Sequence, residues 1–389
     1  LLDRSIKKDG VDMKMKFNIE KFAVGLMSLV LMFTTISVLP VQASSEQNMT
    51  KIFTLDSFIS EVLNNNPEIK LLDGQIQVQE KRIKTINEKA DQERVKSSIP
   101  DEELAQNKTY VLLYPLQAKN KLEDLKWEKK NKAMSLKASA VKLYYQYMFK
   151  QKEIDAKSKA VERAKAELEV VREKVKLGKE NSLSLTQNEN SLELANQQLV
   201  KLKSELQSII LNINSLLNYD LDQKIQFNTE EIKIDEYTIK DIEALIEKRK
   251  AESNSILKLQ RDIEEAKVQY YIESYNRQSL ASSYEQLADK PKELENEISK
   301  ERYNIEEKIR IDYNNILAAY EDIKIEKLSN DLSVKKFEIA EKKYKQGMAS
   351  YIDFMKALEE KENAASSYDQ TQLKYITAVL DFKLYIEEL

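Results

Sequence analysis

Apolar side chains recur at alternating intervals of three and four residues over most of the chain, a pattern typical of helices that pair as left-handed coiled coils. One such series leads up to Gly178 and a longer one follows it: Val161, Ala164, Leu168, Val171 and Val175, then Leu192, Ala195, Leu199, Leu202, Leu206, Ile209, Ile213 and Leu216. Neither Gly nor Pro occurs between Leu116 and Leu177. This stretch of roughly 60 residues corresponds to about 90 Å of helix. The pattern predicts an antiparallel pair of long helices that reverses near Gly178.

Two glycines, Gly178 and Gly347, interrupt long helical patterns and are expected to be the tips of two helical hairpins. Glycine after a helix typically adopts the left-handed conformation, which costs other residues energy. Three residues later, Asn181 and Ser350 are suited to cap the returning helix. Asp353 then falls at the third helical position, which predicts a capping box with its carboxylate at the positive helix end.

The two tips belong to an internal duplication, because they lie 169 residues apart and Tyr144 and Tyr313 share that offset. On the last helix the seam continues through Tyr368, Gln372, Tyr375, Val379, Phe382 and Ile386. We therefore predict a mainly α fold of two long antiparallel coiled-coil hairpins. The first repeat spans 44–217, the second spans 238–389, and 218–237 is a crossover linker or short strand.

Shorter elements precede each hairpin. Phe58, Val62 and Leu63 form the stripe of a short amphipathic helix that ends at Asn64 to Pro67, and a second helix follows from about Glu68 to Val95. The stretch 97–116 is less regular, because Pro100 and Pro115 interrupt it and 110–114 has the composition of a strand. In the second repeat a matching irregular stretch is expected around Pro291. Alternation at 225–227 and 232–234 predicts extended segments.

The N-terminal part of the chain has the features of an export signal. Lys14, Lys16 and Lys21 precede an apolar stretch from Phe22 to Leu39, and 41–43 resembles a cleavage site. We expect 13–43 to be a signal peptide, with an uncleaved anchor helix as the alternative, and 1–12 to come from upstream read-through.

The composition excludes several function classes. Charged residues make up 33% of the chain and hydrophobic residues 42%, which is typical of long helices and coiled coils. The net charge is −4 with both signs interleaved, so no nucleic-acid surface is expected. Because Cys and His are both absent, no thiolate nucleophile, His base or Cys/His metal site can form. We expect no enzyme, catalytic residue, metal or cofactor.

The sequence resembles the TolC family of outer-membrane efflux channels. The opening Thr54-Leu55 with Asn65-Asn66-Pro67-Glu68 is similar to the family's start. Tyr344, Gly347, Ser350 and Asp353 form a Tyr-x-x-Gly-x-x-Ser-x-x-Asp run similar to the family's tip motif. The resemblance covers 44–389 and includes the two-fold repeat.

The resemblance implies a protomer of an α-helical barrel, in which three copies close a twelve-helix tube. It also implies docking of a periplasmic adaptor (membrane fusion) protein at the tips, together with an inner-membrane transporter. The tip residues are Leu177, Gly178, Lys179, Gln346, Gly347, Met348 and Ser350. Tyr344 and Asp353 match positions that help form the family's entrance constriction.

The sequence departs from the family in two places. A membrane-spanning β-strand needs about 9–11 alternating residues, and neither 97–116 nor 274–298 supplies the two strands expected of it. We therefore expect little or no β-barrel, which argues against outer-membrane insertion. Lys356 also stands where members of the family often carry an acidic residue, which weakens an acidic entrance ring.

Two functions from different classes follow. The first is an exported efflux conduit component for small molecules or peptides, located in the outer membrane by resemblance, or in the cell-wall or periplasmic space if no barrel forms. The alternative is a structural coiled-coil protein of the cell envelope without a duct. A tube wall needs a second apolar helix face for its neighbours, and candidates for that face are Leu194, Ile210, Leu217, Ile325, Leu328 and Leu332.

Overall fold

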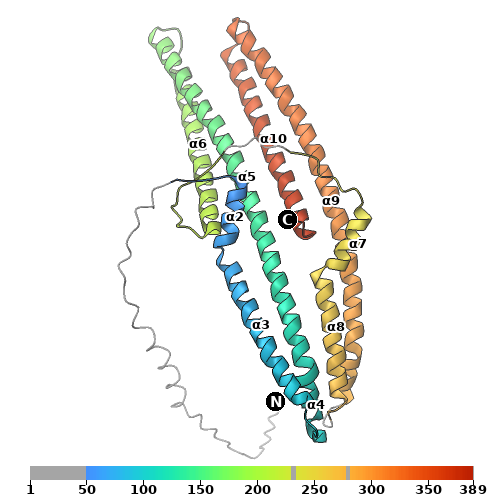
Figure 1. Ribbon diagram of the computed structural model, residues 1–389. Helices are drawn as coiled ribbons and strands as arrows, with labels where there is room; N and C mark the ends of the chain where they lie inside the picture. Colours follow the sequence, from blue (N-terminus) through green and yellow to red (C-terminus); the bar gives the residue numbers. More distant parts are fainter. Residues whose placement is uncertain (1–49, 229–233, 277–280, 389) are drawn as a thin grey trace, which may run out of the picture. The chain divides into compact units, whose positions relative to one another are not determined.

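The computed structural model describes residues 50–228, 234–276 and 281–388 (Figure 1). The expected leader, 1–12 and 13–43, lies outside these residues, as do Ile232 and Lys233. Thr50 to Leu389 form one unit. In chain order its elements are β1 (Lys51–Phe53), α2 (Leu55–Asn65), α3 (Pro67–Arg94), the 3₁₀ turn η1 (Asp101–Glu103), α4 (Leu104–Lys108), the π-helical turn η2 (Thr109–Leu113), α5 (Tyr114–Lys176), α6 (Ser182–Leu217), β2 (Ile225–Phe227), α7 (Ile242–Glu252), α8 (Asn254–Glu273), α9 (Ala281–Lys345) and α10 (Tyr351–Tyr385).

Two long helical hairpins dominate this unit. Helix α5 pairs with α6, α9 pairs with α10, and both tips lie at the same end in Figure 1. The eight seam positions that the 3-4 spacing predicts on α6 are all buried or half-buried. The hairpins also pack against each other through α5 and α10. The predicted mainly α fold with two hairpins is confirmed.

Each hairpin carries two shorter helices. Helices α2 and α3 pack on α5, and α7 and α8 pack on α9 (Figure 1). Thr54 begins α2 with a capping box, and Asn66 caps α3 by accepting hydrogen bonds from the backbone N–H groups of Glu68 and Ile69. Pro67 follows at the first helical turn, where a missing N–H costs nothing. The two halves thus share one order of elements.

Backbone geometry repeats with the 169-residue offset. Among the described residues, positive φ angles occur at Gly178 (67°), Gly347 (71°), Asn218 (56°) and Glu387 (60°). These are two pairs, each 169 residues apart, and they end the outgoing and returning helices of both hairpins. Because non-glycine residues seldom adopt positive φ, the second pair is independent structural support for the duplication.

The core of the first repeat lies where α2, α5 and α6 meet a small sheet. Strands β1 and β2 pair in parallel, with Phe53 opposite Phe227. The Phe227 ring lies 5.0–5.2 Å from the rings of Phe58, Tyr144 and Tyr147. Aromatic edge-to-face contacts of this kind stabilise beyond the area they bury. The extended segment predicted at 225–227 is confirmed as a strand.

Two expectations for the ends remote from the tips are wrong. Residues 109–113 form the π-helical turn η2 instead of a strand, because they continue α4 into α5 and pack against α3 and α8. Pro115 is tolerated at the second position of α5. The irregular stretch around Pro291 is also helical: Pro291 lies within α9, whose nearby Leu294 is buried against Ile263 and Ala266 of α8.

Among the described residues, no helix combines the length and apolar character that crossing a membrane requires.

Candidate functional site: hairpin tips and lateral helix faces

Both tips have the same hydrogen-bonded loop. At the first tip the Lys179 N–H donates to the Lys174 carbonyl (2.8 Å) and the Gly178 N–H donates to the Val175 carbonyl (3.0 Å). At the second tip Met348 donates to Lys343 (2.8 Å) and Gly347 donates to Tyr344 (3.0 Å). This pair of bonds is the Schellman motif, which satisfies the last carbonyls of a helix and requires positive φ at the glycine. The predicted helix stops at both glycines are confirmed.

The returning helices begin as predicted. The Asn181 side chain accepts a hydrogen bond from the Ser184 N–H at 2.8 Å. The Ser350 hydroxyl accepts one from the Asp353 N–H at 3.1 Å, and the Asp353 carboxylate accepts from the Ser350 hydroxyl (2.7 Å) and N–H (3.3 Å). These bonds from Ser350 hold the pKa of the Asp353 carboxyl below its usual range. Asp353 therefore serves its own helix as a cap.

Tyr344 packs within the second hairpin. Its ring stacks on Phe354 with centroids 5.1 Å apart and lies 5.8 Å from the Tyr351 ring. The Tyr344 side chain remains partly exposed. A role of Tyr344 and Asp353 in an entrance constriction stays a prediction, because it concerns an assembly of several chains.

The tips expose apolar side chains. Leu177 and Met348 are 66% and 68% exposed, and Leu183 and Ile352 are 63% and 77% exposed. Leu183 and Ile352 occupy equivalent positions, the second residue of α6 and of α10. Of the predicted docking set, Lys179, Gln346 and Ser350 are exposed as well. Exposed apolar groups clustered in this way mark contact surfaces more often than isolated ones do.

The face between α5 and α10 joins the two hairpins by polar contacts that the sequence did not predict. Lys152 of α5 pairs with Asp369 of α10 at 2.6 Å, and Arg163 pairs with Glu362. Nearer the tips, the Tyr351 hydroxyl donates to Glu167, and burial raises the pKa of both groups. No spacing rule relates residues on two different hairpins, so only the tertiary structure shows these partners.

One face of α9 exposes apolar side chains to solvent. Five of them recur every seven residues: Ile311, Ala318, Ile325, Leu332 and Ile339. Leu328 lies beside this series. We call these six residues the α9 stripe. Helices α3 and α6 of the first repeat expose six further apolar side chains, which lie on more than one side of α6: Leu71, Val78, Leu183, Leu194, Val200 and Leu211. We call these six residues the α3/α6 face.

The duplication relates these open faces to the closed face between α5 and α10. With the 169-residue offset, Leu332 of α9 stands where Arg163 stands on α5, and Val200 of α6 stands where Asp369 stands on α10. The contacts that join the two hairpins inside one chain therefore have uncovered counterparts at both edges. Of the six predicted lateral residues, Leu194, Ile325, Leu328 and Leu332 are exposed, whereas Ile210 and Leu217 pack in the first core.

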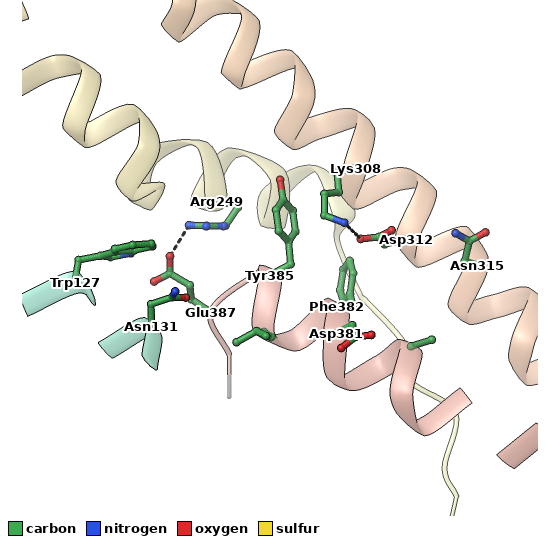
Figure 2. Close-up of a pocket in the computed structure, with 12 residues that line it drawn as sticks. Trp127, Asn131, Arg249, Lys308, Asp312, Asn315, Asp381, Phe382, Tyr385 and Glu387 are labelled. Atoms are coloured by element: carbon green, nitrogen blue, oxygen red, sulfur yellow. Dashed lines mark hydrogen bonds and ion pairs between the residues drawn. The ribbon is translucent and has the colours of Figure 1, made fainter. Parts of the chain in front are cut away.

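A pocket of about 600 Å³, lined by both charged and apolar side chains, lies between the base of the second hairpin and Trp127 and Asn131 of α5 (Figure 2). Arg249 of α7 points to Glu387, with Nη1 and Oε1 2.9 Å apart, and Lys308 pairs with Asp312 at 2.7 Å. Lys308 also lies over the Tyr385 ring, 4.7 Å from its centroid. These charges are mainly paired with each other. Among the described residues, no cluster of carboxylates could hold a metal ion.

No protein-family profile and no curated protein matches the chain. Solved structures do match. A membrane protein from Pseudomonas aeruginosa aligns with a TM-score of 0.67 at 10% identity, over 85% of this chain and 90% of that one. The outer membrane protein VceC from Vibrio cholerae aligns with a TM-score of 0.63 at 12% identity, over 85% and 95%. The CmeC outer membrane channel from Campylobacter jejuni aligns with a TM-score of 0.59 at 14% identity, over 86% and 85%.

The chain therefore has the fold of these proteins, of which VceC and CmeC are described as outer-membrane proteins. The resemblance to the TolC family, inferred from the tip motif and the duplication, is confirmed at the level of the fold.

Proposed function

We propose that the protein is an exported, TolC-like conduit component of the cell envelope. Copies assemble side by side into a helical tube, and a trimer gives a wall of twelve long-helix segments. The tips dock a periplasmic adaptor protein, and an inner-membrane transporter supplies the energy to export small molecules or peptides. The fold that the chain shares with the outer membrane channel CmeC and with the outer membrane protein VceC supports this proposal.

The observation that carries the proposal is the pair of open faces. The α9 stripe on one edge and the α3/α6 face on the other are different surfaces, so a contact between copies would be heterologous and would close into a ring if the rotation permits. The four large heptad side chains of the α9 stripe are about half exposed, so covering them contributes on the order of 3–6 kcal/mol, half of the 1.5–3 kcal/mol each that full burial gives. Association costs on the order of 4–15 kcal/mol, so the opposing face supplies the surplus.

The duplication also predicts which residues meet across the ring. Inside one chain Arg163 pairs with Glu362. The equivalent positions are Leu332 on α9 and Glu193 on α6, both exposed. In the assembly, Leu332 of one copy would lie near Glu193 of its neighbour. A substitution at Leu332 should therefore respond to the sign of its charge.

Light scattering of purified wild-type protein and of Leu332→Glu and Leu332→Arg tests this proposal. We expect a trimer for the wild type and a monomer for Leu332→Glu, because the new carboxylate faces Glu193. Leu332→Arg should remain trimeric, because it recreates the Arg163–Glu362 contact. Leu221→Glu, at an exposed leucine in the crossover, is the control and should leave the trimer intact.

A monomeric wild type at micromolar concentration would contradict the conduit and favour the structural coiled-coil alternative. Equal effects of Glu and Arg at position 332 would contradict the predicted register. Electron microscopy of the trimer supplies the second measurement: a conduit shows a hollow ring, and a bundle without a duct does not.

A further inference from the structure

We propose that the pocket of Figure 2 binds a short peptide that has a free amino group and a free carboxylate, with Arg249 at one end of the site and Asp381 at the other. The pocket volume of about 600 Å³ lies within the range of pockets that enclose small ligands. The site belongs to a single chain, so the inference goes beyond the proposed conduit and does not depend on assembly.

The charges of this pocket are not needed for the fold, because the first repeat makes the same long helices without them. The 169-residue offset relates four charged lining residues to uncharged ones: Lys308 to Ser139, Asp312 to Leu143, Asp381 to Asn212 and Glu387 to Asn218. Arg249 and Glu387 are largely buried, and burying charges costs desolvation energy. A charged pocket in only one of the two repeats therefore indicates a use besides folding.

Glu387 is held in an unfavourable backbone conformation. Its φ angle of 60° is a left-handed value that costs most residues about 1–2 kcal/mol, whereas asparagine, which stands at the equivalent position 218, tolerates it. The Glu387 carboxylate meanwhile holds Lys130 of α5 at 2.7 Å and Arg249 of α7 at 2.9 Å. Strained residues of this kind cluster at binding sites, where the surrounding contacts hold them in place. Glu387 thus positions the end of the pocket at which α5, α7 and the end of α10 meet.

This end of the pocket has one positive charge in excess, because Lys130 and Arg249 share the single carboxylate of Glu387. The pairing with Arg249 is incomplete. Its Nη1 lies 2.9 Å from Oε1 of Glu387 without the alignment of a hydrogen bond, and its buried Nε has no acceptor among the described residues. Buried N–H groups without an acceptor cost about 1–3 kcal/mol each. The carboxylate of a peptide is the acceptor that a guanidinium binds best.

The other end has one negative charge in excess. Lys308 pairs with Asp312 at 2.7 Å, whereas Asp381 makes no salt bridge or hydrogen bond within the described part of the chain. The Tyr385 ring separates the two ends. The Arg249 guanidinium lies 5.6 Å from its centroid and the Lys308 ammonium 4.7 Å, on opposite sides of the ring in Figure 2. A ligand ammonium group is the partner that Asp381 lacks.

The separation of the two ends selects the length of the ligand. In a free amino acid the ammonium and the carboxylate are bonded to one carbon, so they cannot reach both sides of the Tyr385 ring. An extended chain adds about 3.3–3.6 Å per residue, so two or three residues suffice. A simple anion or a simple cation would use only one end. The apolar part of the lining, which includes Trp127 and Leu384, is available to the peptide side chains.

The test uses the only tryptophan of the chain, Trp127, which lines the pocket and reports its occupancy by fluorescence. The purified full chain is titrated at about pH 6.5, where an α-amino group is protonated. The ligands are alanyl-leucine in its free, N-acetylated, C-amidated and doubly capped forms. The free dipeptide should bind about tenfold or more tighter than either singly capped form, because each cap removes one charged contact. Free leucine should bind about tenfold or more weakly, because it cannot span the site.

Two variants separate the two ends. Asp381→Asn, at an exposed position, should abolish the preference for the free amino group and keep the preference for the free carboxylate. Arg249→Gln should do the reverse, and Lys130 still pairs with Glu387 in that variant. Asp331→Asn is the matched control, because it changes an exposed aspartate of α9 outside the pocket, and it should bind as the wild type does.

Equal binding of the four dipeptide forms would overturn the inference, as would a preference for the free amino group that survives Asp381→Asn. Absence of binding at millimolar dipeptide, by both fluorescence and calorimetry, would overturn it too. Light scattering keeps this result distinct from the conduit. A monomer that binds the dipeptide contradicts only the conduit, and a trimer that does not bind it contradicts only the peptide site.

Discussion

The bases of the two hairpins occupy equivalent places in the duplication but are built differently. In the first repeat Val62, Ile213 and Leu217 are fully buried in a dry core beside the β1–β2 pair. In the second repeat Arg249 stands at the place of Val62 when the 11-residue helices α2 and α7 are aligned at their first residues, and Asp312 stands 169 residues after Leu143. Arg249 and Asp312 both line the pocket of Figure 2. The helices around them nevertheless end at matching residues.

The two ends of the crossover between α6 and α7 differ in the same way. The end next to the first repeat is held by strand pairing at Ile225–Phe227. The end next to the second repeat is held by tyrosine hydroxyls: Tyr375 accepts from the Tyr237 N–H at 2.7 Å and donates to the Asp235 carbonyl at 2.9 Å, and Tyr313 accepts from the Ile239 N–H at 3.2 Å. The comparison teaches that turns, caps and seams preserve this architecture, while the chemistry of the core is free to diverge.

Exchanging residues between the two bases should give the largest effect. Val62→Arg introduces a charge into the apolar core of the first repeat. The residue at the position of Glu387 is there Asn218, which carries no charge to pair with it. We therefore expect the free energy of unfolding to fall by about 4 kcal/mol or more. Arg249→Val leaves Glu387 paired with Lys130 at 2.7 Å and should cost about 1–3 kcal/mol. Urea unfolding followed by circular dichroism measures both. Equal losses would show that the two bases do not differ in polarity as described.

The tips test what the repeats have in common. Gly178→Val and Gly347→Val should each cost about 1–2 kcal/mol, because a branched residue at positive φ is strained. An added Cβ meets no neighbour within 4 Å at either glycine, so the two costs should be similar. Gly74→Ala, inside α3, is the control and should stabilise the protein by about 0.5–1 kcal/mol. Thermal unfolding of the three variants gives the comparison, and unequal costs at the tips would break the equivalence.

The tyrosine hydroxyls sharpen the comparison of the two ends of the crossover. Tyr375→Phe removes a hydroxyl that makes two backbone hydrogen bonds and should cost about 1–2 kcal/mol. Tyr313→Phe removes one longer bond and should cost less. Amide hydrogen exchange at Tyr237 should accelerate in Tyr375→Phe only. Unchanged exchange there would show that the crossover is held by other contacts.

The smallest expected effect concerns the half-buried hydrogen bond between Glu167 and Tyr351. Burial raises the pKa of Glu167 in the folded protein, so the folded state binds this proton more readily than the unfolded state. Stability from this group is therefore greatest at low pH and falls as the pH rises from the unfolded to the folded pKa. Glu167→Gln keeps the acceptor for Tyr351 and should raise the melting temperature at pH 7 but not at pH 4. Exposed Glu169→Gln is the control, and a shift of equal size at both pH values would contradict the assignment.

Much of the fold could be predicted from local rules. A glycine between two helical patterns identifies a tip, Asn181 and Ser350 identify the next helix start, and the 3-4 spacing identifies the seam. The rules failed at 109–113, where residues with strand composition continue a helix, and at Pro291, where packing on α8 outweighs one lost hydrogen bond. For the site, sequence reasoning found the tips and four exposed lateral residues but missed Arg163, Glu167 and their partners on α10.

The sequence by itself determined where each helix starts, turns and pairs with its neighbour, because those choices depend on residues a few positions apart. The tertiary structure alone decided which helix faces close and which remain open. Contacts between α5 and α10 join residues about 200 positions apart. No local sequence pattern shows that the face of α5 packs within the chain while the equivalent face of α9 stays exposed. That choice leaves the α9 stripe uncovered, and an uncovered apolar face is the physical basis for an assembly of several copies.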